Sequence, residues 1–268
     1  MNRVNIGYRI KIDNFVEKEE EIIKFLNYYN SLFNCSELKV TKKVLDSSIL
    51  NSIIANYLNN QSYCNNFHID KNYIYNYGSN MRENKLFSLL NGKKTNIITH
   101  LNSYKIDDDL YQNLRYISSE IPKGNNLLLE NPDMSDNLFE YLFACEELSK
   151  KMNLDDIDNI GFCLDYGHIL QFLFNSEMSF NSYYDYLIEQ RNYLERVKEF
   201  HLHDFKSGND HQVFESINQN LINFKKIYLN KPSNTIILEN NVSDNASEIG
   251  VKQIKVIKRM LLNENQKN

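Results

Sequence analysis

The six histidines of this chain cluster beside short apolar runs instead of being scattered over its polar segments. Five of them lie at or just beyond the end of such a run, and the sixth, His211, follows in the next polar stretch. Imidazole binds transition metals and exchanges protons near neutral pH, so this placement indicates metal or acid–base chemistry. The five histidines are His68, His100, His168, His201 and His203.

Acidic side chains close three further apolar runs. Glu130 follows three leucines, Asp165 follows Cys163-Leu164, and Glu239 follows Ile236-Ile237-Leu238. Burying a carboxylate is costly unless it is paired or bound to a cation. Carboxylates mixed with imidazoles therefore predict one to three divalent ions, for which zinc, manganese or iron is better suited than calcium or magnesium alone.

The elements that position these residues alternate along the chain. Short β-type runs begin every 26 to 39 residues, the length of a βα unit, and the segments between them carry helical periodicity. Eight such units predict an α/β fold, a (β/α)8 TIM barrel that forms a single domain over residues 1–268, with a frayed polar tail at 263–268. The predicted strands are Val4–Ile10, Glu37–Val40, Tyr63–His68, Asn96–His100, Leu127–Glu130, Ile160–Asp165, Glu199–His203 and Thr235–Glu239.

Composition narrows the function classes. The 268 residues carry a net charge of -5, which argues against a protein that coats nucleic acid. No apolar run has the length of a membrane span, and the first residues lack a signal-peptide pattern. The four cysteines are far apart with no CxxC motif, so we expect reduced thiols, a cytoplasmic location and no membrane partner.

Several of these stretches resemble the motifs of one superfamily, and they occur in its order. Ile160–His168 resembles its G-x-x-x-D-x-x-H strand end, and Phe200–Lys206 with Asn209–His211 resembles its H-L-x-D strand and following D-x-H loop. Further similar stretches are Leu129–Asn131, Leu238–Asn240, Ile98–His100 and Tyr73–Gly78. Over residues 63–239 the chain thus resembles the xylose-isomerase-like TIM barrels (AP endonuclease family 2), which comprise sugar phosphate isomerases and epimerases and endonuclease IV-type nucleases.

This resemblance implies roles for individual residues. Glu130, Asp165, His201 and Glu239 match the shared metal site. His168 matches a substrate contact of the epimerase branch or a second-metal ligand of the nuclease branch. The remaining matches are His100 and His211 as extra metal ligands, His68 or Asp70 as the first ligand, and His203 as a second-layer or substrate-contact residue. Apart from the resemblance, Lys206 is a candidate contact for phosphate charge if the chain is a hydrolase.

The chain also departs from the nuclease pattern. Asn209 stands where that branch has a metal-binding aspartate, and the first strand, ending near Arg9, lacks the usual histidine. No long basic loop with interspersed aromatics is present for wedging into DNA. Duplex DNA is therefore a less favoured substrate than a small phosphorylated or sugar-like molecule.

Two enzymatic mechanisms remain open from the sequence. The first is hydrolysis of a phosphoester through a di- or trinuclear metal site, for which His100, His168 and His211 are the favouring signal. The second is isomerisation or epimerisation of a sugar or sugar phosphate, with Glu130 and Glu239 as the acid/base pair and one metal stabilising the enediolate. A metal-free binding barrel is a third class, and the oligomeric state has no sequence signal.

Overall fold

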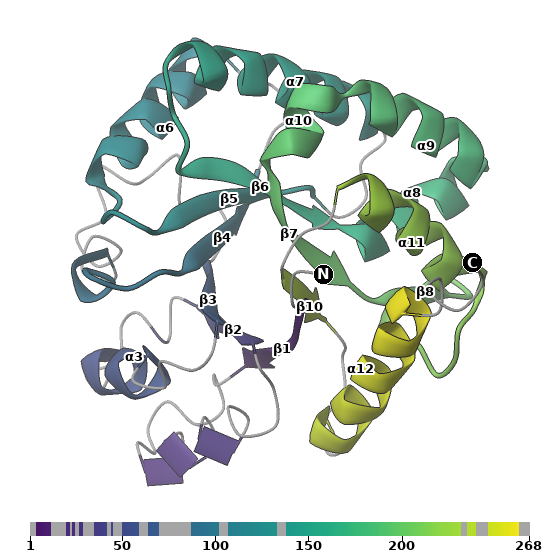
Figure 1. The fold of residues 1–268 in the computed structure, drawn as a ribbon, viewed down its shortest axis with the longest axis horizontal. Coiled ribbons are helices and arrows are strands. Elements are labelled where there is room, and N and C mark those ends of the chain that lie inside the picture. The colour runs from purple at the N-terminus through teal and green to yellow at the C-terminus, as the bar shows by residue number, and fades with distance from the viewer. Residues whose placement is uncertain are drawn as a thin grey trace.

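The computed structural model describes residues 4–11, 20–21, 23–24, 27–28, 35–41, 44, 50–58, 64–69, 87–101, 107–132, 138–231, 235–239 and 246–262. Parallel strands close into a barrel in which neighbouring strands follow chain order, and the first strand pairs with the last (Figure 1). The barrel strands are β1 (Asn5–Lys11), β2 (Cys35–Val40), β3 (Cys64–Ile69), β4 (Asn96–His100), β5 (Asn126–Glu130), β6 (Ile160–Asp165), β7 (Val197–Leu202) and β10 (Thr235–Leu238).

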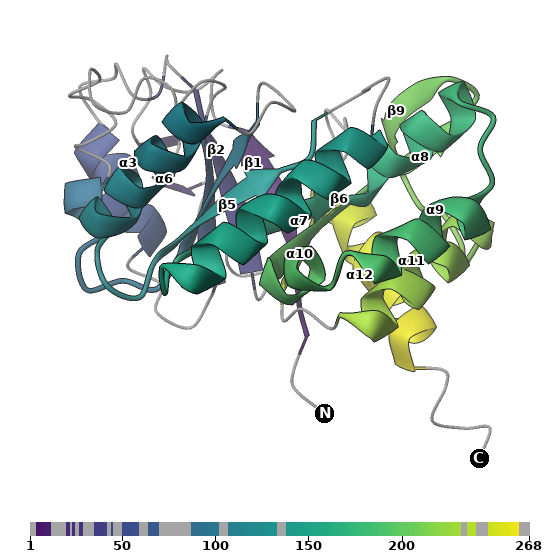
Figure 2. The same cartoon turned by 90° about the horizontal axis from the view of Figure 1, so that it is seen from above.

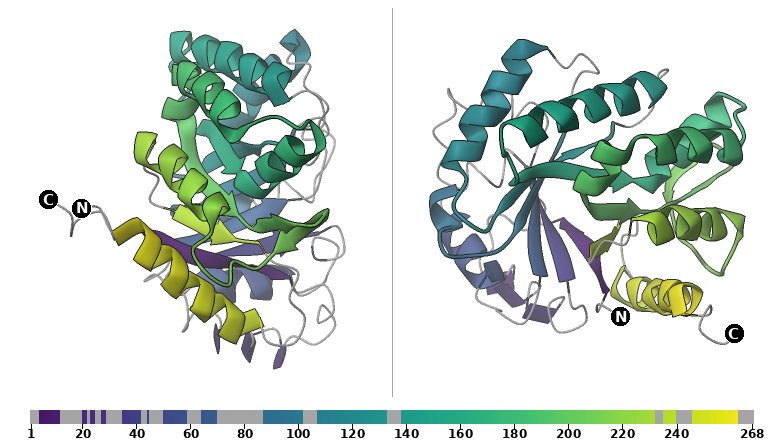
Figure 3. Two further views of the ribbon diagram at one scale, coloured as in Figure 1. Left: turned by 90° about the vertical axis from the view of Figure 1, so that its right-hand side faces the viewer. Right: turned by 45° about the horizontal axis from the view of Figure 1, so that its top comes forward.

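Helices surround the barrel on the outside, as the right-hand view of Figure 3 shows. They are α3 (Leu50–Leu58), α6 (Asp108–Glu120), α7 (Leu138–Leu154), α8 (Tyr166–Asn175), α9 (Phe180–Glu189), α10 (Arg191–Arg196), α11 (Gln219–Asn230) and α12 (Ala246–Leu262). The predicted (β/α)8 barrel is therefore confirmed. In the described part of the chain, no helix is both long enough and apolar enough to span a membrane.

The apolar core lies between the strands and the helices. Leu127, Leu129, Phe162 and Phe200 point outward from the barrel and are fully buried there by the surrounding helices. The alternate residues of the same strands point into the barrel, because side chains of a strand alternate between its two faces. Inside, three residues form a separate small apolar cluster, namely Ile98, Leu128 and Cys163. The rest of the interior is largely polar, which is the feature that builds the site.

All eight predicted strands are present, and no boundary differs from the prediction by more than two residues. The largest shifts are at β2, which begins at Cys35, and at β7, which begins at Val197. The earlier start of β2 places Glu37 in the middle of the strand instead of at its first position. Asp70, Tyr73–Gly78 and the tail 263–268 lie outside the described residues, so the structure leaves their predicted roles untested.

An unpredicted hairpin follows β7. Strands β8 (Asp204–Lys206) and β9 (Asn209–Gln212) pair antiparallel around Ser207 and Gly208, whose φ angles of 52° and 81° are those of a tight hairpin turn. Figure 2 and the left view of Figure 3 show this hairpin at one end of the barrel, opposite the end where β1 begins and α12 finishes. It lies at the carboxyl ends of the strands, where barrel active sites are built.

Candidate metal centre

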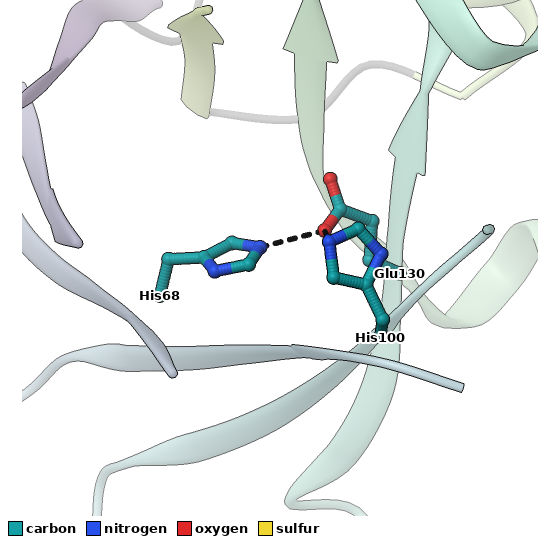
Figure 4. A group of neighbouring side chains, drawn as sticks. All are labelled: His68, His100 and Glu130. Atoms are coloured by element: carbon teal, nitrogen blue, oxygen red, sulfur yellow. Dashed lines mark hydrogen bonds and ion pairs between the residues drawn. The ribbon is translucent and has the colours of Figure 1, made fainter. Parts of the chain in front are cut away.

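A first group of donor atoms joins the ends of β3, β4 and β5 (Figure 4). Nε2 of His68 lies 2.7 Å from Oε2 of Glu130, and Nε2 of His100 lies 3.2 Å from the same oxygen. His100 and Glu130 are register partners on adjacent strands, which fixes their side chains on one face. Two imidazole nitrogens converge on one carboxylate oxygen, and this is a donor set that suits zinc or manganese.

A second, central group lies deeper in the barrel and shares Glu130 with the first. Nδ1 of His201 is 2.5 Å from Oε1 of Glu130 and 2.6 Å from Oε1 of Glu239. Asp165 completes this group, in which all donor atoms lie within 4.8 Å of one another. Its four members are each at most 2% exposed, so their charges are compensated inside the protein.

A third group brings the hairpin onto the ends of β6 and β7. Nε2 of His203 lies 3.1 Å from Oδ1 of Asp165, and its Nδ1 lies 3.0 Å from Oδ1 of Asp210. The other Asp210 oxygen is 2.8 Å from Nδ1 of His211. The rings of His203 and His211 stack at 4.2 Å with an interplanar angle of 4°. This stacking orders the hairpin against the barrel.

His168 enters the same group from the first turn of α8. Its backbone N–H donates to Oδ1 of Asp165, which caps the helix at 3.1 Å. Its Nδ1 lies 2.9 Å from the carbonyl of Asn131, an acceptor only, so Nδ1 donates to it and Nε2 is the ring nitrogen left to face a metal. That Nε2 lies 3.5 Å from Oδ2 of Asp165. A hydrogen bond on the far ring nitrogen is the usual way in which a protein orients a metal-binding histidine.

A second layer of charged residues lies below the donor groups. Nε2 of His201 is 2.9 Å from Oε2 of Glu37 and 3.6 Å from Oε1 of Glu199. Glu199 in turn accepts hydrogen bonds from the amides of Asn66 at 2.6 Å and Asn96 at 2.8 Å. The guanidinium of Arg9 pairs with Glu37 and with Glu239. Charged and amide side chains therefore line the barrel interior below the donor groups as well.

The electrostatics favour charged carboxylates and neutral His100 at the mouth. Burial raises the pKa of Glu130, but His100, His201 and His68 outweigh it and hold that pKa well below the usual range. For Glu239 the pKa is also held well below the usual range, because Arg9 and His201 outweigh burial. Burial lowers the pKa of His100 to about 4, so its imidazole is neutral at physiological pH and free to bind a metal.

The donor groups fit divalent cations. Within the described residues, Oδ2 of Asp165 accepts no hydrogen bond although it is buried. An unsatisfied buried carboxylate oxygen is costly, and a bound cation would satisfy it. A set of imidazoles and carboxylates suits zinc, manganese or iron, and Glu130 is shared by the first and the central group.

Every predicted metal residue among those described lies in one of these three groups. They are Glu130, Asp165, His201, Glu239, His100, His168, His211 and His68. His203, predicted in the second layer or at the substrate, is fully buried between Asp165 and Asp210. Lys206 stays apart: its Nζ donates to the carbonyl of Val213, and its side chain is 44% exposed.

The hairpin changes the interpretation of Asn209. The sequence placed this neutral residue at the position of a metal-binding aspartate, but Asn209 is exposed, and the next residue, Asp210, contacts His203 and His211. Burial raises the pKa of Asp210, but hydrogen bonds from these two histidines outweigh it and lower that pKa far below its usual range. A carboxylate is therefore present in this group after all, one position later than the motif suggested.

Sequence reasoning missed Arg9, Glu37, Glu199 and Asp210. A signal was available for the first three, since each is a charged residue inside an otherwise apolar or β-type run, where a central strand rarely carries charge. For Asp210 the available signal was its charge next to the neutral Asn209, but the motif spacing assigned the ligand position to Asn209.

No family model matches the chain, and no curated protein matches it in sequence. Several solved TIM-barrel structures are similar to this chain at low sequence identity. AsfvAP, an AP endonuclease, is 14% identical with a TM-score of 0.61 and covers 97% of this chain and 99% of its own. An L-ribulose 3-epimerase is 12% identical with a TM-score of 0.66 and covers 98% and 96%. D-psicose 3-epimerase of Clostridium cellulolyticum H10 is 12% identical with a TM-score of 0.54 and covers 96% and 94%.

The chain therefore has a TIM-barrel fold, and this fold is similar to that of solved xylose-isomerase-like barrels, as its motifs suggested. At these identities the likeness establishes the fold alone, and both a nuclease and sugar epimerases share it.

Proposed function

We propose that this chain is a divalent-metal-dependent hydrolase that cleaves a phosphoester or phosphodiester bond in a small nucleotide- or sugar-phosphate-like substrate. The observation that carries the proposal is the third donor group, in which His168, Asp210 and His211 lie beside the central group. A single-metal proton transfer does not need this group, whereas hydrolysis through two or three adjacent ions does.

The residues of the three groups have distinct tasks in this proposal. Bound zinc, manganese or iron ions would supply a water of lowered pKa and charge stabilisation for the phosphate oxygens. Glu130 would bridge the first and central groups, because its two oxygens face different histidines. Glu239 would hold the central position, and His168 would present Nε2 to the third group.

Two further residues act around these groups. His203 works through Asp165 and Asp210, which it contacts on both ring nitrogens, because its full burial keeps it from substrate. Lys206 lies on the exposed hairpin edge, where its ammonium would attract a substrate phosphate.

A second candidate is a sugar or sugar-phosphate isomerase or epimerase. The observation that favours it is the placement of Glu130 and Glu239 at nearly equal distances, 2.5 and 2.6 Å, from Nδ1 of His201. Two carboxylates that flank one metal-binding group could take and return a proton next to a substrate carbonyl. In that case only the central group would hold an ion.

Metal content tests the first proposal directly. The protein is purified without chelator or metal-affinity tag, and its zinc, manganese and iron are measured per chain by elemental analysis. Two or three equivalents, together with release of phosphate or nitrophenol from small phosphoesters, support the hydrolase. One equivalent with interconversion of ketoses and no phosphate release contradicts it and supports the isomerase.

The variant His211→Ala separates the same two functions on one residue. If the chain is a hydrolase, the variant should lose about one metal equivalent and most of its activity, since His211 belongs to the third group. If the chain is an isomerase, the variant should lose little activity, because His211 would lie outside a single-ion site. Cleavage of an abasic-site duplex but not of small phosphodiesters would contradict the small-substrate assignment.

A further inference from the structure

An arginine of the barrel interior, Arg9, lies among the donors of the central group. Arg9 is in the middle of β1, and its register partner on the adjacent strand is Glu37. The residue is 9% exposed, and its side chain reaches into the barrel interior to Glu239, which directly follows the neighbouring strand β10. Nothing in the sequence motifs accounts for a positive charge at this position.

The guanidinium contacts three of the four central residues. Nη1 and Nη2 pair with the two oxygens of Glu239, and Nη2 also lies 3.1 Å from Nδ1 of His201. The same nitrogen is 3.9 Å from Oε1 of Glu130. On its other edge, Nε donates to Oε1 of Glu37. One part of the guanidinium therefore faces the central donors, and another part faces a carboxylate outside them.

The donors that Arg9 contacts are the donors that a central ion requires. A divalent ion on Glu239, His201 and Glu130 would bring a second cation to oxygens that the guanidinium already neutralises. Two cations this close repel strongly in a buried site, where the effective dielectric constant is low. The repulsion is relieved only if the guanidinium gives up Glu239 and keeps Glu37.

We propose that Arg9 is an internal counter-cation that competes with the ion of the central group. The guanidinium neutralises the central carboxylates while the central group holds no ion. When an ion binds, the guanidinium releases Glu239 and keeps its ion pair with Glu37. The inference rests on the proposed metal-dependent function and adds the order in which metal ions fill the donor groups. Among the described residues, the histidines of the two flanking groups, His68 with His100 and His168 with His211, have no contact with Arg9. The first group meets Arg9 only through Glu130, at 3.9 Å, so we expect both flanking groups to fill at lower metal concentration than the central group.

The competition predicts the effect of removing the charge. Arg9→Met frees the central donors and leaves Glu37 and Glu239 uncompensated, which destabilises the empty protein more than the loaded one. Linkage then requires the central ion to bind more tightly in the variant. We expect its dissociation constant to fall by about tenfold or more, the scale of one charge-assisted hydrogen bond.

The experiment is an equilibrium titration of the full chain with Mn²⁺ or Zn²⁺ against a chromogenic chelator, with melting temperatures measured in EDTA and in excess metal. Wild type is compared with Arg9→Met and Arg9→Lys. The matched control is Arg196→Met. Arg196 is also buried, at 7% exposed, but donates to the carbonyls of Ile157 and Ile160, away from the donor groups.

The proposal is supported if Arg9→Met has a lower melting temperature than wild type in EDTA and if added metal raises that temperature by more. The dissociation constant of its weakest metal site must also be lower than in wild type. Arg9→Lys keeps one charge but cannot reach all three partners, so its weakest site also tightens, by less. Arg196→Met loses melting temperature with unchanged metal affinity. Equal or weaker binding by both Arg9 variants overturns the proposal, because Arg9 would then assist the site.

The two Arg9 variants keep the proposal testable even if one of them does not fold. If Arg9→Met does not fold in EDTA, Arg9→Lys alone supplies the dissociation constant, and equal or weaker binding by it overturns the competition. Absence of metal binding by wild type overturns the proposed function itself. The two failures are thus distinguished by the wild-type titration.

Discussion

Gly167 packs directly against the imidazole of His203. A Cβ built on residue 167 would lie 1.8 Å from Cε1 and 2.1 Å from both ring nitrogens of His203. Gly167 is in the first turn of α8, so the helix can approach the barrel mouth only because this residue has no side chain. The same ring is held by Asp165 and Asp210 on its other edges, and it cannot move without breaking one of these ion pairs.

Gly167→Ala is therefore expected to displace His203 and weaken the third donor group. We expect a loss of stability on the order of 1–3 kcal/mol, the usual cost of overpacking, and weaker binding of one metal equivalent. Thermal unfolding and metal titration measure the two effects. In a His203→Ala background the methyl group has room, so Gly167→Ala should cost much less there. Equal costs in the two backgrounds would show that the contact is not the cause.

Glu239→Gln is expected to abolish turnover while the chain stays folded. The substitution keeps the shape of the side chain but removes the charge that pairs with Arg9 and faces His201. We expect a rate loss of about 10³-fold or more, measured with the substrate identified by the metal and substrate tests. Glu248→Gln is the control, because this residue is an exposed partner of Lys252 on α12. Activity within about tenfold of wild type would show that the site is assigned wrongly.

Asp210→Asn and Asn209→Ala separate two neighbouring hairpin residues. Asp210 contacts both His203 and His211, whereas Asn209 is exposed. We therefore expect Asp210→Asn to lower the metal content by about one equivalent and Asn209→Ala to leave it unchanged. Elemental analysis of the two purified variants gives the answer. The opposite result would restore the position that the sequence motif suggested.

The metal-free protein is expected to lose stability between about pH 6.5 and pH 10. Burial lowers the pKa of His203, but Asp165 and Asp210 outweigh it and raise that pKa to about 10, above the ordinary value of 6.5. A raised pKa in the folded state means that the proton stabilises the fold. This contribution is complete below pH 6.5 and is lost as the pH rises through 10.

Denaturant unfolding in EDTA at a series of pH values measures this loss, which we expect to be on the order of a few kcal/mol. His203→Asn keeps a hydrogen-bond donor but cannot take up the proton, so its stability should change less over the same range. Identical pH profiles for wild type and His203→Asn would contradict the assignment.

The barrel and most of the donor residues were predictable from the sequence because short stretches of a few residues determine both. Apolar runs such as Leu127–Leu129 specify buried parallel strands wherever they occur in the chain. A charged residue that ends such a run, such as Glu130 or Asp165, is then placed at the carboxyl end of a strand. Since these ends converge in a barrel, the strand assignments alone predicted that the residues meet.

The second layer and the hairpin were decided by tertiary structure. Arg9 and Glu239 are 230 residues apart, and only the closure of β1 against β10 brings them together. The choice of Asp210 over Asn209 depends on the turn at Ser207 and Gly208, which sets the register of β9. His211 has a φ of 54°, which interrupts the extended backbone, so the adjacent residues Asp210 and His211 both face His203 while Asn209 is exposed. Motif spacing carries no information about that register, and the folded hairpin does.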